Sequence, residues 1–227
     1  KRVACIGAGP ATLTVANDLL PIGYEVVIFE QYAIAGGLMR TNIPAFRLPA
    51  QVLDEEIGYV INIGADLRLG TPVASMRQLL DQGGYDAVFV GTGAPKGKEL
   101  ELSGRRDTDR IHIGIAWLES VAFEHIDRIG ERVLIIGVGN TAMDCCRTSL
   151  RLGAKSVKVM ARKPRGFFKA SEWELEDAEE EHVEIIVNHA PKAFIIEGGR
   201  LTGMRFDRIE YEMDGNAIRS QRVVEEV

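Results

Sequence analysis

The stretch VLIIGVGNTA at residues 133–142 decides the fold class of this chain. An apolar run stops at a glycine turn and a helix-like stretch follows, which is the arrangement that holds a nucleotide phosphate. The chain already opens with the same arrangement, VACIGAGPAT at residues 3–12. A small domain for one ligand needs a single turn of this kind, so the two turns predict sites for two dinucleotides.

The pattern around the two turns is that of an α/β protein. Short β-branched runs alternate with longer helical stretches, as in RVACIG, PATLTVANDLL and EVVIFE, and this predicts two Rossmann-like dinucleotide-binding domains. Residues 31–49 contain paired glycines and two prolines, which predicts a loop without any regular element. Residues 192–224 predict hairpins with turns at GG and DGN.

A polar, glycine-bearing stretch at residues 94–112 separates the two halves. We therefore predict two domains, residues 1–115 around the first turn and residues 116–227 around the second. The chain begins at Lys1, two residues before a predicted core strand, and it ends on VVEEV without turn or cap residues. This suggests a fragment of a longer polypeptide.

The composition narrows the possible functions. Of the 227 residues 46% are hydrophobic, which is ample for a buried core, and the net charge of -6 argues against nucleic acid as a partner. Three cysteines without CxxC spacing favour core packing in a reducing compartment and exclude a redox-active dithiol. The four histidines show no metal-ligand spacing, so no metal is predicted. No membrane span and no signal peptide is recognisable, which predicts a cytoplasmic protein.

The first turn has the chemistry of a dinucleotide site. Gly7 permits the tight turn, Gly9 lets the backbone approach a pyrophosphate, and the helix that follows offers unpaired N–H groups. Glu30 ends the next strand, where a carboxylate accepts the hydroxyls of an adenosine ribose. The alternative is a tight turn without a ligand. Thr12 stands where the pattern has a third glycine, so the helix must move outward or the opposing strand must compensate.

The second turn differs from the first in the charge that follows it. Its second strand ends in Ala161-Arg162-Lys163 in place of an acid, and residues 155–169 carry six basic residues and no acidic one. A solvated basic face is one interpretation. The end of this strand is also where the adenosine ribose lies, so cations there can pair with a 2′-phosphate. This predicts NADPH in preference to NADH, with NAD remaining possible.

These motifs together resemble the glutamate synthase small-subunit family of FAD-dependent NAD(P)H oxidoreductases, a group that includes the flavin half of dihydropyrimidine dehydrogenase. The similarity runs from Arg2 nearly to the end of the chain, through GAGPA, IFE, GGLMRTNIPAFRLP, YDAVFVGTGAP, GVGNTAMDCCRTSLRLGA, ARKPRGFFKA and EDAEEEHVEIIV. The segment from GGL to FRLP is far more specific than either glycine turn.

The resemblance implies which residues line each site. The implied FAD site consists of Gly7, Ala8, Gly9, Pro10, Ala11, Thr12, Glu30, Gln31, Gly37, Leu38, Arg47 and Val73, with Thr92 and Gly93 at a crossover near it. The implied nicotinamide nucleotide site consists of Gly137, Val138, Gly139, Asn140, Thr141, Ala142, Arg162, Lys163 and Lys169. For Arg47, a cation that faces FAD is the favoured interpretation and a surface ion pair is the alternative.

The resemblance also implies a function. A hydride passes between NAD(P)H and FAD in either direction, and single electrons pass on to iron-sulfur clusters on a partner subunit or another segment. The complex would be a glutamate synthase, an aldehyde or formate oxidoreductase of the molybdenum or tungsten type, or another reductase. No side chain is predicted to be catalytic, because the cofactors carry the chemistry. The family's closing flavin segment is missing here, so the flavin domain is expected to be incomplete. The alternative is a nucleotide-sensing or structural subunit without turnover.

Overall fold

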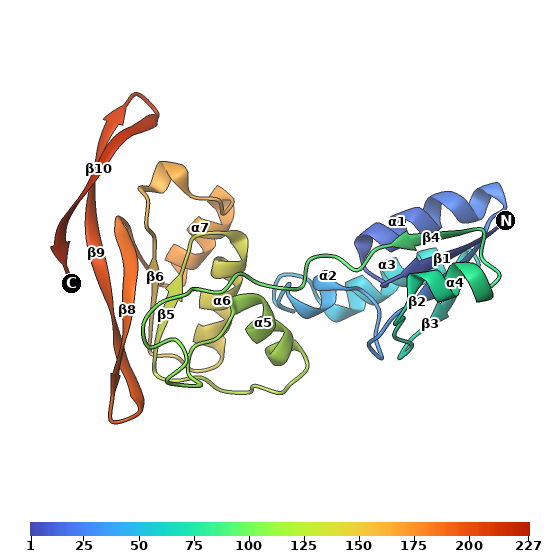
Figure 1. The fold of residues 1–227 in the computed structure, drawn as a ribbon, viewed down its shortest axis with the longest axis horizontal. Helices are drawn as coiled ribbons and strands as arrows, with labels where there is room; N and C mark the ends of the chain where they lie inside the picture. Colours follow the sequence, from blue (N-terminus) through green and yellow to red (C-terminus); the bar gives the residue numbers. More distant parts are fainter. The chain divides into compact units, whose positions relative to one another are not determined.

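The computed structural model describes residues 1–227, which form two compact units, Lys1–Lys96 and Gly97–Val227. Each unit contains a parallel sheet whose strands are connected through helices (Figure 1). The predicted α/β fold with two Rossmann-like halves is therefore confirmed. The assignment of residues 1–115 to a flavin and of residues 116–227 to a nicotinamide nucleotide concerns ligands and stays a prediction.

The first unit is a four-stranded parallel sheet with helices on both faces. Its strands, in the order β3-β2-β1-β4, are β1 (Arg2–Ile6), β2 (Glu25–Phe29), β3 (Asp66–Arg68) and β4 (Ala87–Val90). Its helices are α1 (Pro10–Leu19), α2 (Leu38–Thr41), α3 (Ala50–Asn62) and α4 (Met76–Gln82), with a 3-10 turn at Leu20–Ile22.

Side chains of the first sheet alternate between two cores. Val3 and Cys5 of β1 pack on one face with Leu13 of α1, whereas Ala4 packs on the opposite face with Tyr85. This follows from the two-residue period of a strand. Because both faces are covered, the strands read as continuous apolar runs rather than as alternating ones.

The prediction that residues 31–49 hold no regular element is wrong at one place. Helix α2 forms between the paired glycines and Pro44. Gly37 precedes it with φ 53° and ψ -138°, a conformation that only glycine adopts readily. A short helix thus begins immediately after Gly37, which the sequence pattern indicates only as a residue that interrupts regular structure.

The second unit combines a parallel sheet with an antiparallel one. The parallel strands, in the order β5-β6-β7, are β5 (Arg132–Ile136), β6 (Ser156–Met160) and β7 (Glu184–Ile186). The antiparallel strands, in the order β10-β9-β8, are β8 (His189–Glu197), β9 (Arg200–Asp214) and β10 (Ala217–Glu226). The helices are α5 (Gly114–Ala122), α6 (Asn140–Arg151) and α7 (Glu172–Glu180), with a 3-10 turn at Arg165–Phe167.

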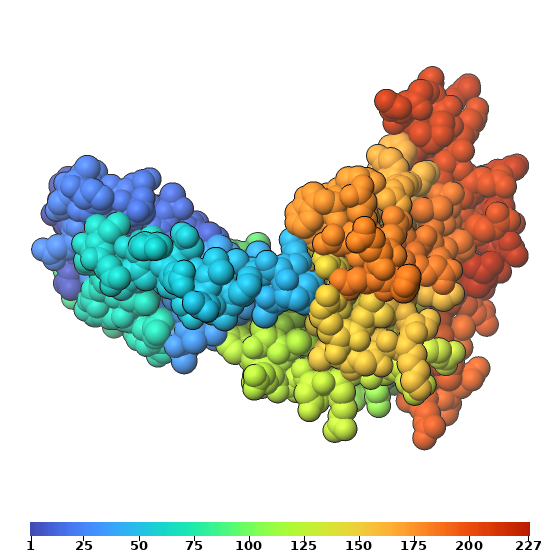
Figure 2. Space-filling model, turned by 180° about the vertical axis from the view of Figure 1, so that it is seen from behind, coloured from blue at the N-terminus to red at the C-terminus, as the bar shows by residue number.

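The predicted hairpins are confirmed as these last three strands. Gly198 and Gly199 turn β8 into β9, and Gly215 turns β9 into β10, all three with positive φ. The antiparallel sheet covers one side of the parallel sheet while α5 and α6 cover the other (Figure 1). Figure 2 shows the β9–β10 turn projecting beyond the rest of this unit.

All three cysteines are buried and free, as the sequence predicts. Burial raises the pKa of Cys5 to about 11 and that of Cys146 to about 12, so both thiols stay protonated at neutral pH. Cys145 and Cys146 pack into different clusters, Cys145 with Trp117 and Cys146 with Met143. No helix in the structure is both long and apolar enough to pass through a lipid bilayer.

An ion-pair network fastens α6 to α7. The guanidinium of Arg147, a residue only 8% exposed, donates to Asp177 at 2.7 Å and to Glu181 at 2.8 and 3.0 Å. Arg151 adds bonds to Glu181 at 2.6 and 3.0 Å. Because Arg147 comes from the buried face of α6, this network helps to fix the helix that begins at the second glycine turn.

Acid should weaken the second unit through Glu181. Hydrogen bonds from Arg151 and Arg147 lower the pKa of Glu181 from 4.5 to about 2. A carboxyl group with a depressed folded-state pKa stabilises the native state above its unfolded-state pKa and loses that contribution as the pH falls through the folded-state pKa. The unfolding free energy should therefore decline between about pH 4.5 and pH 2. Urea unfolding of the wild type and Glu181→Gln should give a difference that shrinks over this range, and a constant difference would contradict the assignment.

Candidate dinucleotide-binding sites

The first glycine turn leads directly from β1 into α1. Gly7 has a φ of +92°, and its N–H donates to the carbonyl of Phe29 at 2.7 Å, which holds the turn against the end of β2. Helix α1 starts at Pro10 after Gly9, and no side chain caps its N-terminus. Pro10 has no N–H, and the N–H groups of Ala11 and Thr12, which follow it, have no side-chain cap to accept from them.

A second pair of glycines lies against this turn. The Gly36 N–H donates to the carbonyl of Ala8 at 2.9 Å, and a Cβ placed on Gly37 would lie 2.8 Å from the Cα of Gly9. Two backbones thus meet where only glycine leaves room. The predicted site residues Gly9 and Gly37, 28 positions apart in the sequence, are brought together here.

Arg40 fixes the same loop from the other side. Its Nε donates to the carbonyl of Ala35 at 3.2 Å, and its guanidinium pairs with Asp54 of α3. Only 15% of the Arg40 side chain is exposed. Sequence reasoning did not select Arg40 as a site residue, although it stands within the GGLMRT motif and three residues after Gly37.

Glu30 joins the end of β2 to the first turn. One carboxylate oxygen accepts from the Ala8 N–H at 2.8 Å and the other accepts from the Tyr32 N–H at 2.9 Å. The residue is 5% exposed. A carboxylate has about four acceptor positions, so each oxygen can still accept one hydroxyl. The position of Glu30 at the strand end agrees with the sequence analysis, and its role toward a ribose stays a prediction.

The other residues predicted for the flavin site lie at several places in the first unit. Thr92 is beside the turn, because a Cβ on Gly7 would lie 3.4 Å from its Cα, and Gly93 follows with a φ of +67°. Val73 packs in the core on the α4 side of the sheet. Gln31 is exposed after Glu30, Leu38 is half-buried at the start of α2, and Arg47 is half-buried.

The second turn repeats the backbone of the first. Gly137 has a φ of +115° and its N–H donates to the Met160 carbonyl at 3.1 Å, as Gly7 does to Phe29. Helix α6 begins at Asn140 after Gly139, again without a side-chain cap. Ala161 takes the place that Glu30 has in the first unit, since its N–H also donates across to the third strand. The two turns therefore share their geometry and differ in charge.

A basic loop, residues 161–171, closes over the second turn. The N–H groups of Lys169 and Ala170 donate to the carbonyl of Val138 at 3.0 and 3.1 Å. The Ser171 N–H donates to the side-chain oxygen of Asn140 at 3.0 Å. The loop thus brings the predicted residues Val138, Asn140 and Lys169 together.

Only half of the cations at residues 155–169 are unpaired. Lys155 pairs with Glu131, Lys158 pairs with Glu184, and Arg165 pairs with both Glu172 and Glu179 of α7. The exposed cations that form no ion pair are Arg162, Lys163 and Lys169. These are the three basic residues predicted for the nicotinamide nucleotide site.

The start of the basic loop is held by the antiparallel sheet. The hydroxyl of Tyr211 on β9 donates to the Arg162 carbonyl at 2.6 Å, and the His189 N–H donates to the Ala161 carbonyl at 3.0 Å. The pairing of Arg165 with α7 holds the middle of the loop. Sequence reasoning did not select Tyr211, because 49 residues separate it from Arg162.

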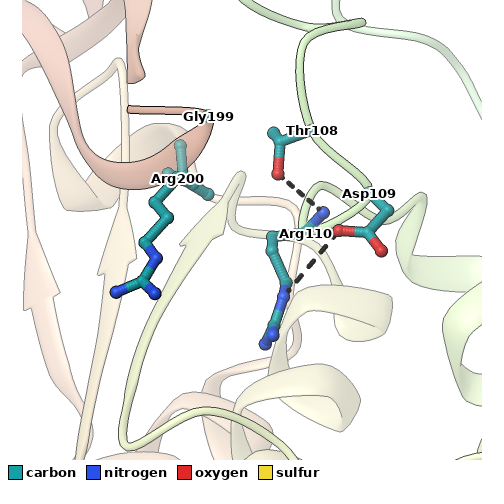
Figure 3. Close-up of a pocket in the computed structure, with 6 residues that line it drawn as sticks. Thr108, Asp109, Arg110, Gly199 and Arg200 are labelled. Carbon is teal, nitrogen blue, oxygen red and sulfur yellow. Dashed lines mark hydrogen bonds and ion pairs between the residues drawn. The ribbon is translucent and has the colours of Figure 1, made fainter. Parts of the chain in front are cut away.

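A surface hollow of about 480 Å³ in the second unit contains none of the predicted site residues. It is lined by Thr108, Asp109, Arg110, Gly199, Arg200 and Leu201 (Figure 3). The Thr108 hydroxyl accepts from the Arg110 N–H at 3.2 Å, and the Arg110 Nε lies 3.8 Å from Asp109. Asp109 and Arg110 are exposed to solvent, and we assign no ligand to the hollow.

Comparison with known proteins identifies the family. A family model described as pyridine nucleotide-disulphide oxidoreductase matches residues 1–218. The chain belongs to this family. The resemblance drawn from the sequence motifs is confirmed as well, because curated glutamate synthase small chains are among the relatives.

Two relatives cover most of this chain but have longer chains of their own. The NADP(+)-dependent formate dehydrogenase subunit beta of Moorella thermoacetica is 37% identical over 92% of this chain and 30% of its own length. The glutamate synthase [NADPH] small chain of Escherichia coli (strain K12) is 34% identical over 99% of this chain and 50% of its own. The chain therefore spans half or less of the length of these relatives.

A solved structure supports the fold. FprA of Mycobacterium tuberculosis in complex with NADPH matches 100% of this chain and 68% of its own chain, with a TM-score of 0.82 and 16% identity. At this identity the match shows that the backbone folds alike, and it assigns no residue a role.

Proposed function

We propose that this chain is the dinucleotide-binding part of an NADPH-dependent FAD oxidoreductase that acts as the electron-input subunit of a larger complex. One observation carries the proposal. The two glycine turns have the same backbone geometry, yet the first is followed by the buried carboxylate of Glu30 and the second by the unpaired cations Arg162 and Lys163. This is the contrast expected between a site for an unphosphorylated adenosine ribose and a site for a 2′-phosphate.

The residues of the first unit fit FAD. The uncapped first turn of α1 would offer N–H groups to the pyrophosphate. Gly9 and Gly37 have no side chains, so the pyrophosphate could approach the backbone closely at these two residues. Glu30 would accept from the ribose with the acceptor positions that Ala8 and Tyr32 do not use. Arg40 would hold the loop in place.

The residues of the second unit fit NADPH. The uncapped start of α6 would receive the pyrophosphate beside Gly139, and Arg162, Lys163 and Lys169 of the basic loop would pair with the 2′-phosphate. When bound, the nicotinamide and the flavin supply the hydride chemistry. The chain's own residues bind and orient the two cofactors and exclude water.

The partner and the cellular location are part of the proposal. The names of the two relatives describe subunits of a formate dehydrogenase and of a glutamate synthase. By this similarity we propose a partner subunit or segment that carries iron-sulfur clusters, in a complex of one of these kinds. The three buried, free thiols are compatible with the reducing cytoplasm.

Anaerobic mixing of the purified complex with NADPH or with NADH tests this function. NADPH should bleach the visible absorbance of the bound flavin. A preparation that holds FAD but shows no bleaching with either nucleotide would overturn the oxidoreductase and leave the nucleotide-sensing subunit. A preparation without FAD would overturn the flavin site itself.

Replacing Arg162 should reduce the preference for NADPH. A charge-assisted hydrogen bond to phosphate contributes about 1.5–3 kcal/mol, which corresponds to about a ten- to hundredfold change. In Arg162→Ala, kcat/KM should fall by this factor for NADPH and stay nearly constant for NADH. Arg222→Ala is the matched control, because it removes an arginine of the same unit that pairs with Glu210 on the antiparallel sheet. Equal losses for both nucleotides would contradict the assignment of Arg162.

A further inference from the structure

The third residue of α1, Thr12, is a buried polar residue at a position where the dinucleotide-binding pattern has glycine. Thr12 is fully buried, and its hydroxyl oxygen has no hydrogen-bond partner. The dinucleotide-binding pattern has a glycine at this position so that the helix packs closely on the sheet. A buried hydroxyl without a partner indicates that the position is set by packing rather than by hydrogen bonding.

Gly91, directly after β4, supplies the room that Thr12 takes. A Cβ built on Gly91 would lie 2.2 Å from the hydroxyl oxygen of Thr12, far inside any contact distance. The next neighbours of that Cβ would be Phe89 Cε1 at 3.1 Å and the Ile6 carbonyl at 3.4 Å. Gly91 does not have a left-handed φ, so its backbone conformation suits any residue and only the lack of space demands glycine.

Gly91 also bounds the first turn itself. Its N–H donates to the Ile6 carbonyl at 2.8 Å, and a Cβ on Gly7 would lie 2.7 Å from the Gly91 carbonyl oxygen. The backbone at residue 91 therefore lies against both the glycine turn at Gly7 and the beginning of helix α1 at Thr12. A displacement here would move the N–H groups at the start of α1, to which we assign the pyrophosphate.

We propose that Gly91 is a positioning residue of the flavin site. Gly91 lies directly after β4, and its lack of a side chain allows the close packing that a third glycine at position 12 would otherwise allow. Thr12 and Gly91 then form a coupled pair: a side chain is tolerated at one position only because the other has none. This inference rests on the proposed FAD site for its effect on cofactor binding. Its packing component is independent of that site.

A set of four variants of the complete flavoprotein tests the pair. Gly91→Ala should raise the dissociation constant for FAD by about ten- to a hundredfold, the range expected from forcing one methyl group into a packed contact. Adding Thr12→Ala should restore most of the affinity, because it removes the hydroxyl and the γ-methyl group. Adding Thr12→Val should restore none, because valine keeps a carbon atom where the hydroxyl oxygen stood. Gly58→Ala in α3, where a Cβ meets nothing within 4 Å, is the matched control.

The melting temperature of the apoprotein is the second measurement, and it separates this inference from the proposed function. Gly91→Ala should lower it, Thr12→Ala should recover it in the double variant, and Thr12→Val should not. If Gly91→Ala alone does not fold, recovery of a folded protein by Thr12→Ala gives the same support. Failure of Thr12→Ala to rescue either FAD affinity or folding would overturn the coupling. A wild type that holds no FAD would overturn the proposed function, and the melting temperatures would still decide on the pair.

Discussion

Gly37→Ala should lower the affinity of the flavin site that we propose in the first unit. The backbone of Gly37, at φ 53° and ψ -138°, is strained for any residue with a Cβ, and that Cβ would lie 2.8 Å from the Cα of Gly9. Backbone strain of about 1–3 kcal/mol and steric overlap of similar size add to roughly 3 kcal/mol or more. This corresponds to about a hundredfold or greater loss of FAD affinity.

The loss should appear in cofactor binding more than in folding. Gly37 lies in a loop outside the sheet, and this loop is joined to the turn by the bond from Gly36 to Ala8. The chain can therefore relieve the overlap by moving the loop away from the turn. Titration of the apoprotein with FAD, followed by flavin fluorescence, measures the effect.

Gly70→Ala is the matched control for Gly37→Ala. Gly70 has a similar φ of +60° in the same unit, but a Cβ there would meet nothing within 4 Å. It should lose some stability through its left-handed backbone and retain FAD. If Gly37→Ala binds FAD as tightly as Gly70→Ala does, the contact between Gly37 and Gly9 has no part in the site.

Arg147→Met should destabilise the second unit by about 2–3 kcal/mol. Removing one partner of a buried ion pair costs about 3–5 kcal/mol because the other charges stay behind, and we reduce this figure because Asp177 and Glu181 are partly exposed. Methionine keeps much of the side-chain volume, so the loss reports the charge network rather than a cavity. Urea unfolding followed by far-UV circular dichroism measures the difference.

Arg165→Met provides the comparison for this variant. Arg165 also pairs with two carboxylates of α7, Glu172 and Glu179, but 44% of its side chain is exposed. Exposed pairs contribute about 0–1 kcal/mol, so this variant should be nearly as stable as the wild type. Equal losses of unfolding free energy in the two variants would show that the burial of Arg147 does not determine how much its ion pairs stabilise the second unit.

Patterns among neighbouring residues were sufficient to predict the main helices and strands of both units. A two-residue or 3.6-residue period and a glycine at each turn are properties of neighbouring residues, so β1, α1, β5 and α6 could be predicted from them. Thr12 could be recognised as a departure from the pattern for the same reason, and compensation by the opposing strand was one of two expectations. The sequence alone could not say which residue beside the helix compensates, because Gly91, directly after β4, is 79 positions away from Thr12.

The tertiary structure decided what depends on contacts between distant segments. The sequence shows six cations at residues 155–169 as equivalent, whereas folding places carboxylates of β7, α7 and the segment before β5 beside three of them. Arg162, Lys163 and Lys169 are left without ion pairs because no acidic side chain folds next to them. Charge along a chain is set by composition, but pairing of charges is set by the approach of segments in space. For this reason the sequence determined that two glycine turns of the same kind exist, and only the fold showed which cations have no ion pair.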